Sequence, residues 1–168
     1  QVLFFFFYLT KLSEKELAKI RLDEMGFIFQ QMYMMKNLTI LDNIVLPAAE
    51  SKKSKESRQE KQERGEQLMR KMGIIEIADN DINEVSGGQL QRACICRSMM
   101  NRPKLLFADE PTGNLDSKTS SEVLGLLKRT SEEFHQTIVM ITHNNDIARL
   151  ADRIVRIEDG KITGGMKL

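Results

Sequence analysis

Apolar runs alternate with amphipathic and polar stretches along the chain, and this order predicts strands separated by helices. Three short apolar runs predict strands, at Phe27–Phe29, Leu105–Ala108 and Thr137–Thr142. The third run is β-branched or apolar throughout, which is typical of a strand buried on both faces of a parallel sheet. The alternation therefore indicates an α/β fold with a mainly parallel sheet.

A serine followed three residues later by a glutamate marks the first predicted helix. Ser13 and Glu16 form this pair and predict a capping box that opens a helix reaching about Leu22. We expect Gly26 to end this helical unit.

Two further helices are predicted between residues 37 and 73. The first covers 37–47 and ends at Pro47, because proline breaks a helix interior. The second covers the segment 51–67, where almost every residue is charged or polar, and it ends with residues 68–72 before Gly73. Two pairs of opposite charge stand at i,i+4 spacing: Glu60 with Arg64, and Glu66 with Arg70. This pattern is typical of an exposed helix, and a disordered linker or a partner surface is the alternative.

The second half of the chain continues the alternation. The predicted elements are a helix over 89–100 closed by Asn101-Arg102-Pro103, a helix over 118–129, a helix over 146–150, and strands over 153–158 and 161–163. Asp159-Gly160 stands between these last two strands, and an Asp-Gly pair in this position predicts a hairpin turn.

The only long apolar run, Val2–Leu9, contains four consecutive phenylalanines. It is far shorter than the roughly 20 residues that span a bilayer. It also has neither the basic flank nor the small-residue cleavage site of a signal peptide. We therefore expect a buried strand. The chain begins at Gln1 rather than at Met, which indicates a fragment or a processed product.

Length and charge restrict the class of protein. The 168 residues suit one ordinary domain, or one domain with a subdomain, that buries its own core. The chain carries 25 basic and 24 acidic residues, so no global charge favours nucleic acid as a partner. Cys94 and Cys96 stand two apart in a predicted helix and point to different faces. We expect them to be small core residues in a reducing compartment.

Polar residues follow three predicted strands at the points where these strands end. Gln30 follows the first, Asp109 and Glu110 close the second, and His143 follows the third. Parallel strands end at one edge of a sheet, where open α/β proteins bind their ligands. A carboxylate there can hold Mg²⁺, and a second acid can polarise a water. A lone histidine after a strand is more often structural, but the convergence of three strand ends predicts nucleotide chemistry.

A serine and two glycines precede the helix predicted over 89–100. Ser86 can cap this helix. Gly87 and Gly88 leave backbone N–H groups bare at its N-terminus, where the helix dipole favours a phosphate. Such a turn alone is ordinary. With Gln89 and Arg92 after it, and an Asp-Glu strand end about twenty residues downstream, the pattern is specific.

These motifs make the chain resemble the nucleotide-binding domain of ABC transporters, nearest to the macrolide-exporter and lipoprotein-releasing subgroup. The matching segments are Val85-Ser86-Gly87-Gly88-Gln89 for the signature, Leu105–Glu110 for Walker B, Asn114-Leu115-Asp116 for the D-loop, Gln30 for the Q-loop and His143 for the switch histidine. The resemblance implies a P-loop NTPase-like, mainly parallel sheet with an inserted helical subdomain at 37–100. The whole chain, 1–168, would be a single partial ATP-binding domain.

The resemblance also implies cofactors and residue roles. ATP and Mg²⁺ would bind at the strand ends, with Asp109 and Gln30 at the metal. Gln30 would also sense the attacking water. Glu110 would act as general base on this water, and His143 would contact the γ-phosphate.

Further roles implied by the resemblance concern partners. Ser86, Gly87, Gly88 and Gln89 would close over ATP held by a second ABC ATP-binding subunit in a head-to-tail dimer, and Asp116 would line the seam. Transmembrane permease subunits are the other implied partners, with their contact around residues 31–41. They would hold the protein peripherally on the cytoplasmic face of the plasma (inner) membrane.

One motif of the family is missing from the sequence. No Gly-x4-Gly-Lys-Ser/Thr phosphate loop, or Walker A motif, occurs among the ten glycines. We therefore expect the fold to lack the Walker A strand and helix, and the chain alone to hydrolyse very little ATP. A degenerate half-site subunit, which lends its signature to an intact partner, is the alternative. Heads of DNA-repair ATPases are disfavoured, because the roughly fifty-five residues between Gln30 and Ser86 leave no room for long coiled coils.

Overall fold

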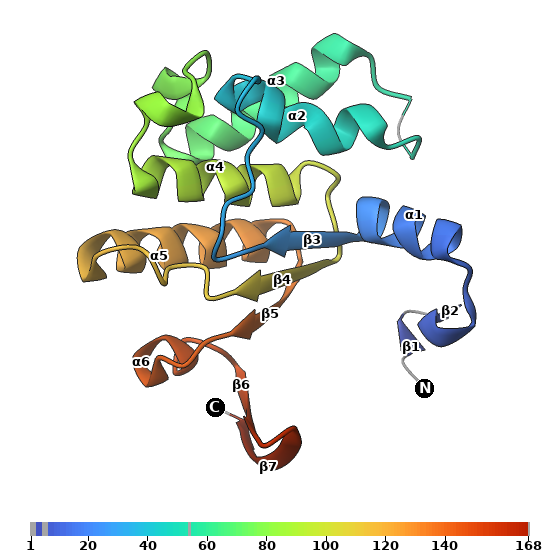
Figure 1. The fold of residues 1–168 in the computed structure, drawn as a ribbon, viewed down its shortest axis with the longest axis vertical. Helices are drawn as coiled ribbons and strands as arrows, with labels where there is room; N and C mark the ends of the chain where they lie inside the picture. The colour runs from blue at the N-terminus through green and yellow to red at the C-terminus, as the bar shows by residue number, and fades with distance from the viewer. Residues whose placement is uncertain (1–2, 5–6, 54, 168) are drawn as a thin grey trace.

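Three parallel strands form the central sheet of the protein (Figure 1). The computed structural model describes residues 3–4, 7–53 and 55–167. The central strands, in their order across the sheet, are β3 (Met25–Ile28), β4 (Leu105–Asp109) and β5 (Thr137–Ile141). Ile28 pairs with Ala108, and Ala108 pairs with Met140. The three strands therefore end at the same edge, as the sequence predicts.

Helices cover one face of this sheet in layers (Figure 1). The helices nearest the strands are α4 (Gly87–Met99) and α5 (Ser117–Glu133), and those packed on α4 are α2 (Ile40–Glu50) and α3 (Arg58–Met72). Their shared core includes the buried side chains of Ile44, Met72, Ile95, Leu106 and Leu127. Burial of these apolar groups is the main favourable term that holds α4 and α5 on the sheet.

The remaining elements connect or extend this core. They are β1 (Leu3–Phe4), β2 (Phe7–Tyr8), the short 3-10 helices η1 (Leu9–Lys11), η2 (Ile75–Ile77) and η3 (Ile82–Glu84), α1 (Glu14–Glu24), α6 (Asn145–Ala148), β6 (Arg153–Glu158) and β7 (Lys161–Lys167). The antiparallel hairpin β6–β7 stands away from the central sheet (Figure 1). Its predicted turn is confirmed, since Asp159 and Gly160 both have left-handed backbone, with φ of 48° and 73°.

The predicted capping box at the start of α1 is confirmed. Glu16 N donates to Ser13 Oγ at 3.4 Å, and Ser13 N donates to Glu16 Oε2 at 2.8 Å. Gly26, however, does not end this helical unit but lies inside β3. A Cβ at Gly26 would lie 2.4 Å from Leu106 Cδ2 and 2.5 Å from the Ser98 carbonyl oxygen. Glycine is therefore needed where β3 passes close to β4 and α4, which is the reason the prediction is wrong.

Pro47 does not end α2, contrary to the prediction. The helix begins after Thr39, whose hydroxyl accepts a hydrogen bond from Asp42 N at 3.1 Å. It continues to Glu50, three residues beyond Pro47. Proline removes its own N–H from the helix, but the Pro47 carbonyl accepts from Ser51 N at 3.1 Å and from Asn101 Nδ2 at 3.0 Å. These bonds hold the last turn of α2 in place.

The polar helix α3 begins later than expected, and one of its predicted ion pairs is wrong. Glu60 belongs to the capping box at the start of α3, where its carboxylate accepts from the N-cap backbone at 2.7 Å. Arg64 therefore pairs with Glu56 instead of Glu60. The pair of Glu66 with Arg70 is confirmed, at 3.0 Å.

Strand β5 is not buried on both faces, contrary to the prediction. Val139 is 44% exposed and Ile141 is 62% exposed. The reason is that, among the described elements, α4 and α5 cover only one face of the sheet (Figure 1). We call the other face the open sheet face; it bears Phe27, Phe29, Phe107, Val139 and Ile141. The Phe27 ring stacks on those of Phe29 and Phe107, with centroids 6.0 Å and 5.5 Å apart.

The N-terminal apolar run is not one continuous strand. Leu3 pairs with Tyr8 and Phe4 with Phe7, so β1 and β2 form a short antiparallel pair. Residues 2, 5 and 6 of the predicted strand, and the burial of residues 2–8, lie outside what the structure describes. Within the described residues, no helix has the length and apolar character needed to cross a bilayer.

Cys94 and Cys96 are buried in α4 and are not joined by a disulfide, which confirms that they are small core residues. Burial raises the pKa of the Cys94 thiol to about 11, against the smaller opposing effect of the Arg97 charge. Burial also raises the pKa of Cys96, and the charge of Cys94 adds to this shift.

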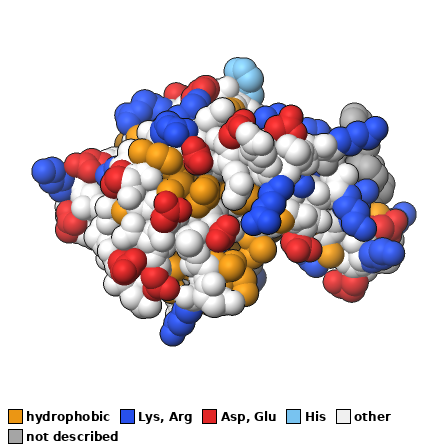
Figure 2. Space-filling model, turned by 90° about the horizontal axis from the view of Figure 1, so that it is seen from above, with side chains coloured by type: hydrophobic (Ala, Val, Ile, Leu, Met, Phe, Trp, Pro, Cys, Tyr) orange, Lys and Arg blue, Asp and Glu red, His pale blue; other side chains and the backbone are white. Residues whose placement is uncertain are grey.

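Charges of both signs are interspersed over the face seen from the α2 and α3 side, with apolar atoms between them (Figure 2). Arg92 pairs with Glu122 at 2.8 Å, and Lys53 pairs with Glu24 at 2.8 Å. Partly exposed pairs of this kind contribute little to stability. The mixed surface agrees with the near-zero net charge of the chain.

Candidate functional site

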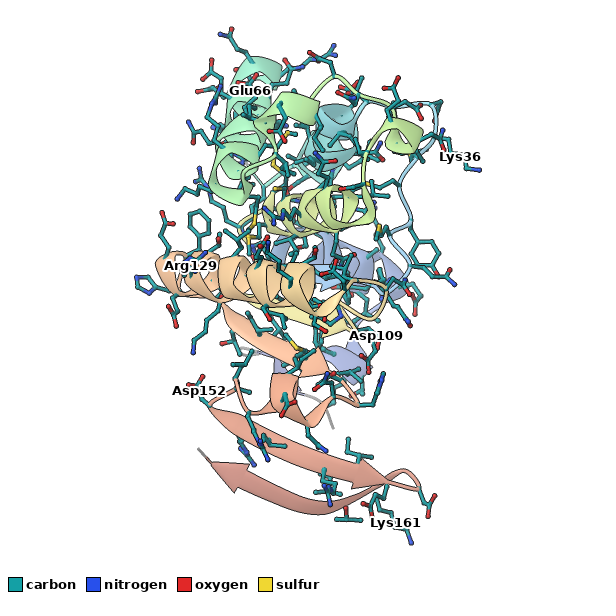
Figure 3. The ribbon with its side chains drawn as sticks, turned by 90° about the vertical axis from the view of Figure 1, so that its left-hand side faces the viewer. Lys36, Glu66, Asp109, Arg129, Asp152 and Lys161 are labelled. Carbon is teal, nitrogen blue, oxygen red and sulfur yellow. The ribbon has the colours of Figure 1, made fainter. Side chains whose placement is uncertain are left out.

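The parallel register brings three polar strand ends to one edge of the sheet. Ile28, Ala108 and Met140 are paired with one another across β3, β4 and β5. Gln30, Glu110 and Thr142 each follow their own member of this row by two residues. Figure 3 looks onto this edge, where Asp109 at the end of β4 lies on the same side of the molecule as Lys36 of the loop that follows β3. Sequence reasoning predicts this convergence from the strand ends alone.

Glu110 is held in a strained and well-defined position. Its backbone is left-handed, with a φ of 44°, which residues other than glycine seldom adopt. Its N–H donates to the Ile141 carbonyl at 3.0 Å, so the pairing of β4 with β5 continues through the bend. Glu110 Oε1 accepts from His143 N at 2.8 Å and lies 2.6 Å from His143 Nδ1, and Oε2 accepts from the Thr142 hydroxyl at 3.4 Å.

The two side chains of this pair differ sharply in exposure. The Glu110 side chain is 18% exposed and the His143 side chain is 86% exposed. The carboxylate is therefore shielded and held in one direction, while the imidazole faces solvent. Because Nδ1 faces a carboxylate oxygen, the contact requires a proton on Nδ1 or on the carboxyl group. A shielded carboxylate of fixed direction suits a general base.

The loop after β4 ties Gln30 to Glu110. Asn114 Nδ2 donates to the Gln30 carbonyl at 3.3 Å. A Cβ at Gly113 would lie 3.0 Å from Gln30 Nε2, so glycine permits this close approach. Gly113 N donates to the Glu110 carbonyl at 3.1 Å and closes the turn.

The serine-glycine turn forms the N-terminus of α4. Gln89 N donates to Ser86 Oγ at 3.3 Å, and Ser86 N donates to Gln89 Oε1 at 2.9 Å, which makes a capping box. A Cβ at Gly88 would lie 2.7 Å from Thr119 Cγ2, so α4 could not lie this close to α5 with a larger residue. The first N–H groups of the helix have no intrahelical acceptor and can face an anion.

Asp116 caps α5 beside this turn. Its carboxylate accepts from Lys118 N and Thr119 N at 3.0 Å each, and from the Thr119 hydroxyl at 2.6 Å. These hydrogen bonds, the one from the Thr119 hydroxyl first, lower the pKa of Asp116. A Cβ at Gly87 would lie 3.8 Å from Leu115 Cδ2. The N-termini of α4 and α5 therefore stand side by side.

The predicted site residues fall into two groups. Gln30, Asp109, Glu110 and His143 stand at the edge of the sheet, and Ser86, Gly87, Gly88, Gln89 and Asp116 stand where α4 and α5 begin. Residues 111–116 connect the groups. The sequence analysis gave no site role to Thr142 or Gly113, and it placed Asn114 in the D-loop without a role of its own. The one available signal for Thr142 is its position at the end of a strand, directly before a nominated histidine.

The donor atoms at the sheet edge are of the kind that Mg²⁺ prefers. Asp109 is exposed at the end of β4, and Gln30, also exposed, adds an amide oxygen. Magnesium commonly uses one or two carboxylates and completes its shell with water and substrate phosphates, so this pair fits the ion. Among the described residues, no group of three or more His, Cys, Asp or Glu side chains could hold a metal without such help.

Helices stacked on a parallel sheet, acids at its carboxyl edge and a glycine turn at a helix start define a nucleotide-binding α/β domain. The family model described as ABC transporter matches residues 9–113. The chain belongs to the ABC transporter family, in agreement with the resemblance of its motifs.

Named relatives and solved structures support this assignment. The chain is 44% identical over 154 residues to the bacitracin export ATP-binding protein BceA of Halalkalibacterium halodurans, covering 92% of this chain and 60% of that protein. It is 42% identical over 151 residues to the macrolide export ATP-binding/permease protein MacB of Syntrophobacter fumaroxidans, covering 90% and 21%.

The fold of the chain is that of an ABC ATP-binding cassette. It matches the dimeric post-hydrolysis structure of the cassette MJ0796 of Methanocaldococcus jannaschii, bound to ADP and Pi, with a TM-score of 0.87 and 35% identity. That match covers 98% of this chain and 71% of the cassette. The chain spans less than two thirds of the length of BceA and about a fifth of MacB.

Proposed function

We propose that the chain is part of the ATP-binding and ATP-hydrolysing subunit of an ABC transporter, which powers export or lipoprotein or peptide transport through a separate membrane permease. The observation that carries this proposal is the shielded Glu110 carboxylate at the end of β4, with its oxygen 2.6 Å from His143 Nδ1. The export functions in the names of BceA and MacB support the transport role.

Each residue at the sheet edge has a chemical task in this proposal. Glu110 accepts the proton of the attacking water, because its carboxylate is aimed and poorly solvated. His143, which is exposed, leaves Glu110 and contacts the γ-phosphate. Gln30 contacts the metal and the attacking water. Asp109 holds Mg²⁺ directly or through water, and the bound ion would neutralise charge that develops on the phosphates.

The second group of residues serves a partner. Ser86, Gly87, Gly88 and Gln89 close over the γ-phosphate of ATP held by a second ABC ATP-binding subunit in a head-to-tail dimer, and Asp116 lines the seam. The bare N–H groups at the start of α4 supply the attraction for this phosphate. The dimeric state of the MJ0796 cassette supports this arrangement.

The permease contact follows from the same family analogy. We place it around residues 31–41, at the border of a helical subdomain that spans 37–100. Binding to permease subunits would hold the protein peripherally on the cytoplasmic face of the plasma (inner) membrane.

The test is a chimera in which a segment carrying a Gly-x4-Gly-Lys-Ser/Thr phosphate loop precedes this chain, whose own sequence does not contain this motif. We expect the chimera to hydrolyse ATP with Mg²⁺, and Glu110→Gln to lower kcat by about a hundredfold or more, since a positioned general base contributes roughly 10²–10⁴. Steady-state phosphate release measures both.

Glu132→Gln is the matched control, because Glu132 is an exposed carboxylate on α5. It should leave kcat within about twofold. An active chimera whose kcat survives Glu110→Gln would contradict the general-base role. The unmodified chain should hydrolyse very little ATP, and steady turnover by it would contradict the expectation that hydrolysis needs the phosphate loop.

A second function has one observation in its favour. The signature turn is fully formed by its capping box, whereas the sequence contains no phosphate loop. A half-site subunit, which lends its signature turn to an intact partner, needs this turn but no phosphate loop of its own. If this is its function, adding the chain to a cassette with an intact phosphate loop and a disabled signature will restore ATP hydrolysis.

A further inference from the structure

An arginine of α4 forms hydrogen bonds to the backbone of the loop between β3 and α2. Arg97 Nη2 donates to the Met32 carbonyl at 2.7 Å, and Nη1 donates to the Tyr33 carbonyl at 2.8 Å. Nη1 also lies 3.4 Å from Met34 Sδ. One guanidinium therefore binds two successive carbonyl groups, just beyond Gln30.

Other side chains hold the flanks of the same loop. Asn114 donates to the Gln30 carbonyl at one end. At the other end, Asn43, which is fully buried, accepts from Met35 N at 2.7 Å and donates to the Met35 carbonyl at 3.0 Å. Arg97 supplies the central anchor between these two.

The backbone that Arg97 anchors is strained at Tyr33, whose side chain faces solvent. Tyr33 has a left-handed φ of 43° and is 65% exposed, so its side chain does not bury enough surface to fix this conformation. Its ring makes an edge contact with Phe29, with centroids 5.7 Å apart. These two rings and Arg97 help to line a groove of about 350 Å³ beside β3. The shape of the groove therefore depends on the anchor.

We propose that Arg97 is a positioning residue, which fixes the loop after Gln30 to α4 and thereby sets the place of Gln30 at the sheet edge. The planar fork of arginine can reach two carbonyls at once, whereas the ammonium of lysine has no such fixed geometry. Arg97 stands roughly three helical turns along α4 from the Ser86 turn. A rigid helix therefore links the signature turn to the loop.

Limited chymotrypsin digestion of the 168-residue chain tests the anchor directly. Cleavage after Tyr33 requires the loop to leave α4, and its rate follows the population of the open form. We expect Arg97→Lys to raise this rate about tenfold. Arginine makes a charged hydrogen bond to each of two carbonyl groups, whereas lysine can keep at most one of these bonds. Mass spectrometry separates this cut from others. Cleavage after Phe134, which is 39% exposed on the far end of α5, reports any global loosening in the same digest.

Arg21→Lys is the matched control. Arg21 lines the same groove but pairs with Glu14 at 3.7 Å on the surface of α1. This variant should leave the Tyr33 rate unchanged. The proposal is overturned if Arg97→Lys cuts after Tyr33 no faster than Arg21→Lys, or if cutting after Tyr33 and Phe134 accelerates equally.

Chemical rescue separates positioning from general packing. Ethylguanidinium added to Arg97→Ala should restore the slow cut after Tyr33, whereas ethylammonium should not. Equal effects of the two cations would overturn the proposal.

The catalytic part of the inference rests on the proposed function. In the active chimera, Arg97→Lys should lower kcat about tenfold with KM for ATP changed less than twofold, because Gln30 would act on water and metal in the transition state. An unchanged kcat would overturn the link to Gln30. A chimera without ATPase activity would refute the proposed function, while the digestion would still decide whether Arg97 anchors the loop.

Discussion

At the scale of single residues, the two buried cysteines make stability depend on pH. Burial raises the pKa of Cys94 from 9.0 to about 11, so the folded state holds this proton more tightly than the unfolded state does. The stability from the neutral thiol is fully present below about pH 9 and is lost as pH rises through about 11. The pKa of Cys96 is raised in the same direction.

We expect the free energy of unfolding to fall by at least about 2 kcal/mol further between pH 8 and 10.5 in the native chain than in a Cys94→Ala, Cys96→Ala double variant, because Cys94 alone accounts for about 2 kcal/mol and Cys96 adds to it. Urea unfolding at each pH gives both values. Comparison with the double variant cancels the titration of lysine and tyrosine. Parallel curves for the two proteins would contradict the assigned cause.

Residue-level signals in the sequence proved reliable where the physics is local. Ser13 correctly predicted a capping box and Ser86 a helix cap, because the bonds that they make reach only three residues along the chain. Gly26 and Pro47 misled because their surroundings come from distant segments. Gly26 faces α4 and β4, and the last turn around Pro47 is held partly by Asn101. The shielding of Glu110 by Thr142 and His143 is likewise a product of the fold.

At the scale of elements, α3 has few buried side chains, so its N-terminal cap contributes a noticeable share of its stability. It is the most polar of the long helices, and it buries only Gly65, Leu68, Met69 and Met72. We expect Ser57→Ala to lower the free energy of unfolding by about 1 kcal/mol, the usual cost of losing an N-cap hydroxyl. Thermal or urea unfolding of the chain measures this loss.

Ser121→Ala provides the comparison for this cap. Ser121 is exposed within α5, and its hydroxyl donates to the Ser117 carbonyl at 3.0 Å. Alanine should be neutral or slightly stabilising there. Equal losses in the two variants would mean that the Ser57 hydroxyl has no special role as a cap.

The identity of elements was more predictable than their burial. Strand β4 starts at the predicted residue, and α5 starts one residue early, because apolar pattern and caps lie in the local sequence. The apolar pattern of residues 137–142 correctly predicted a strand, but it wrongly predicted that both faces of this strand are buried. A run such as 137–142 shows that a strand is apolar, but whether both faces are covered depends on which other segments pack on the sheet.

At the scale of the whole molecule, the open sheet face exposes a contiguous group of apolar side chains among the described residues. Phe29, Val139 and Ile141 are each more than 40% exposed on it. We expect the 168-residue chain to self-associate as its concentration rises, because contiguous exposed apolar patches favour association. Sedimentation velocity over a hundredfold concentration range measures this.

Substitution on the open sheet face should weaken the association. Val139→Thr with Ile141→Thr keeps β-branched side chains in β5 while it removes apolar contact, and we expect association to weaken at least fivefold. Ile162→Thr on the β6–β7 hairpin, where Ile162 is 75% exposed, is the control. A chain that stays monomeric throughout, or equal weakening by the control, would contradict the role of this face.

The strained backbone of Glu110 has a consequence for anyone who engineers this protein. A left-handed φ of 44° favours glycine, and relief of such strain is of order 1 kcal/mol. A screen that rewards heat resistance alone would therefore favour Glu110→Gly and would discard the carboxylate that we assign as general base. Selection for thermostability in this family must therefore also select for ATP turnover, because at this position a substitution that raises stability removes activity.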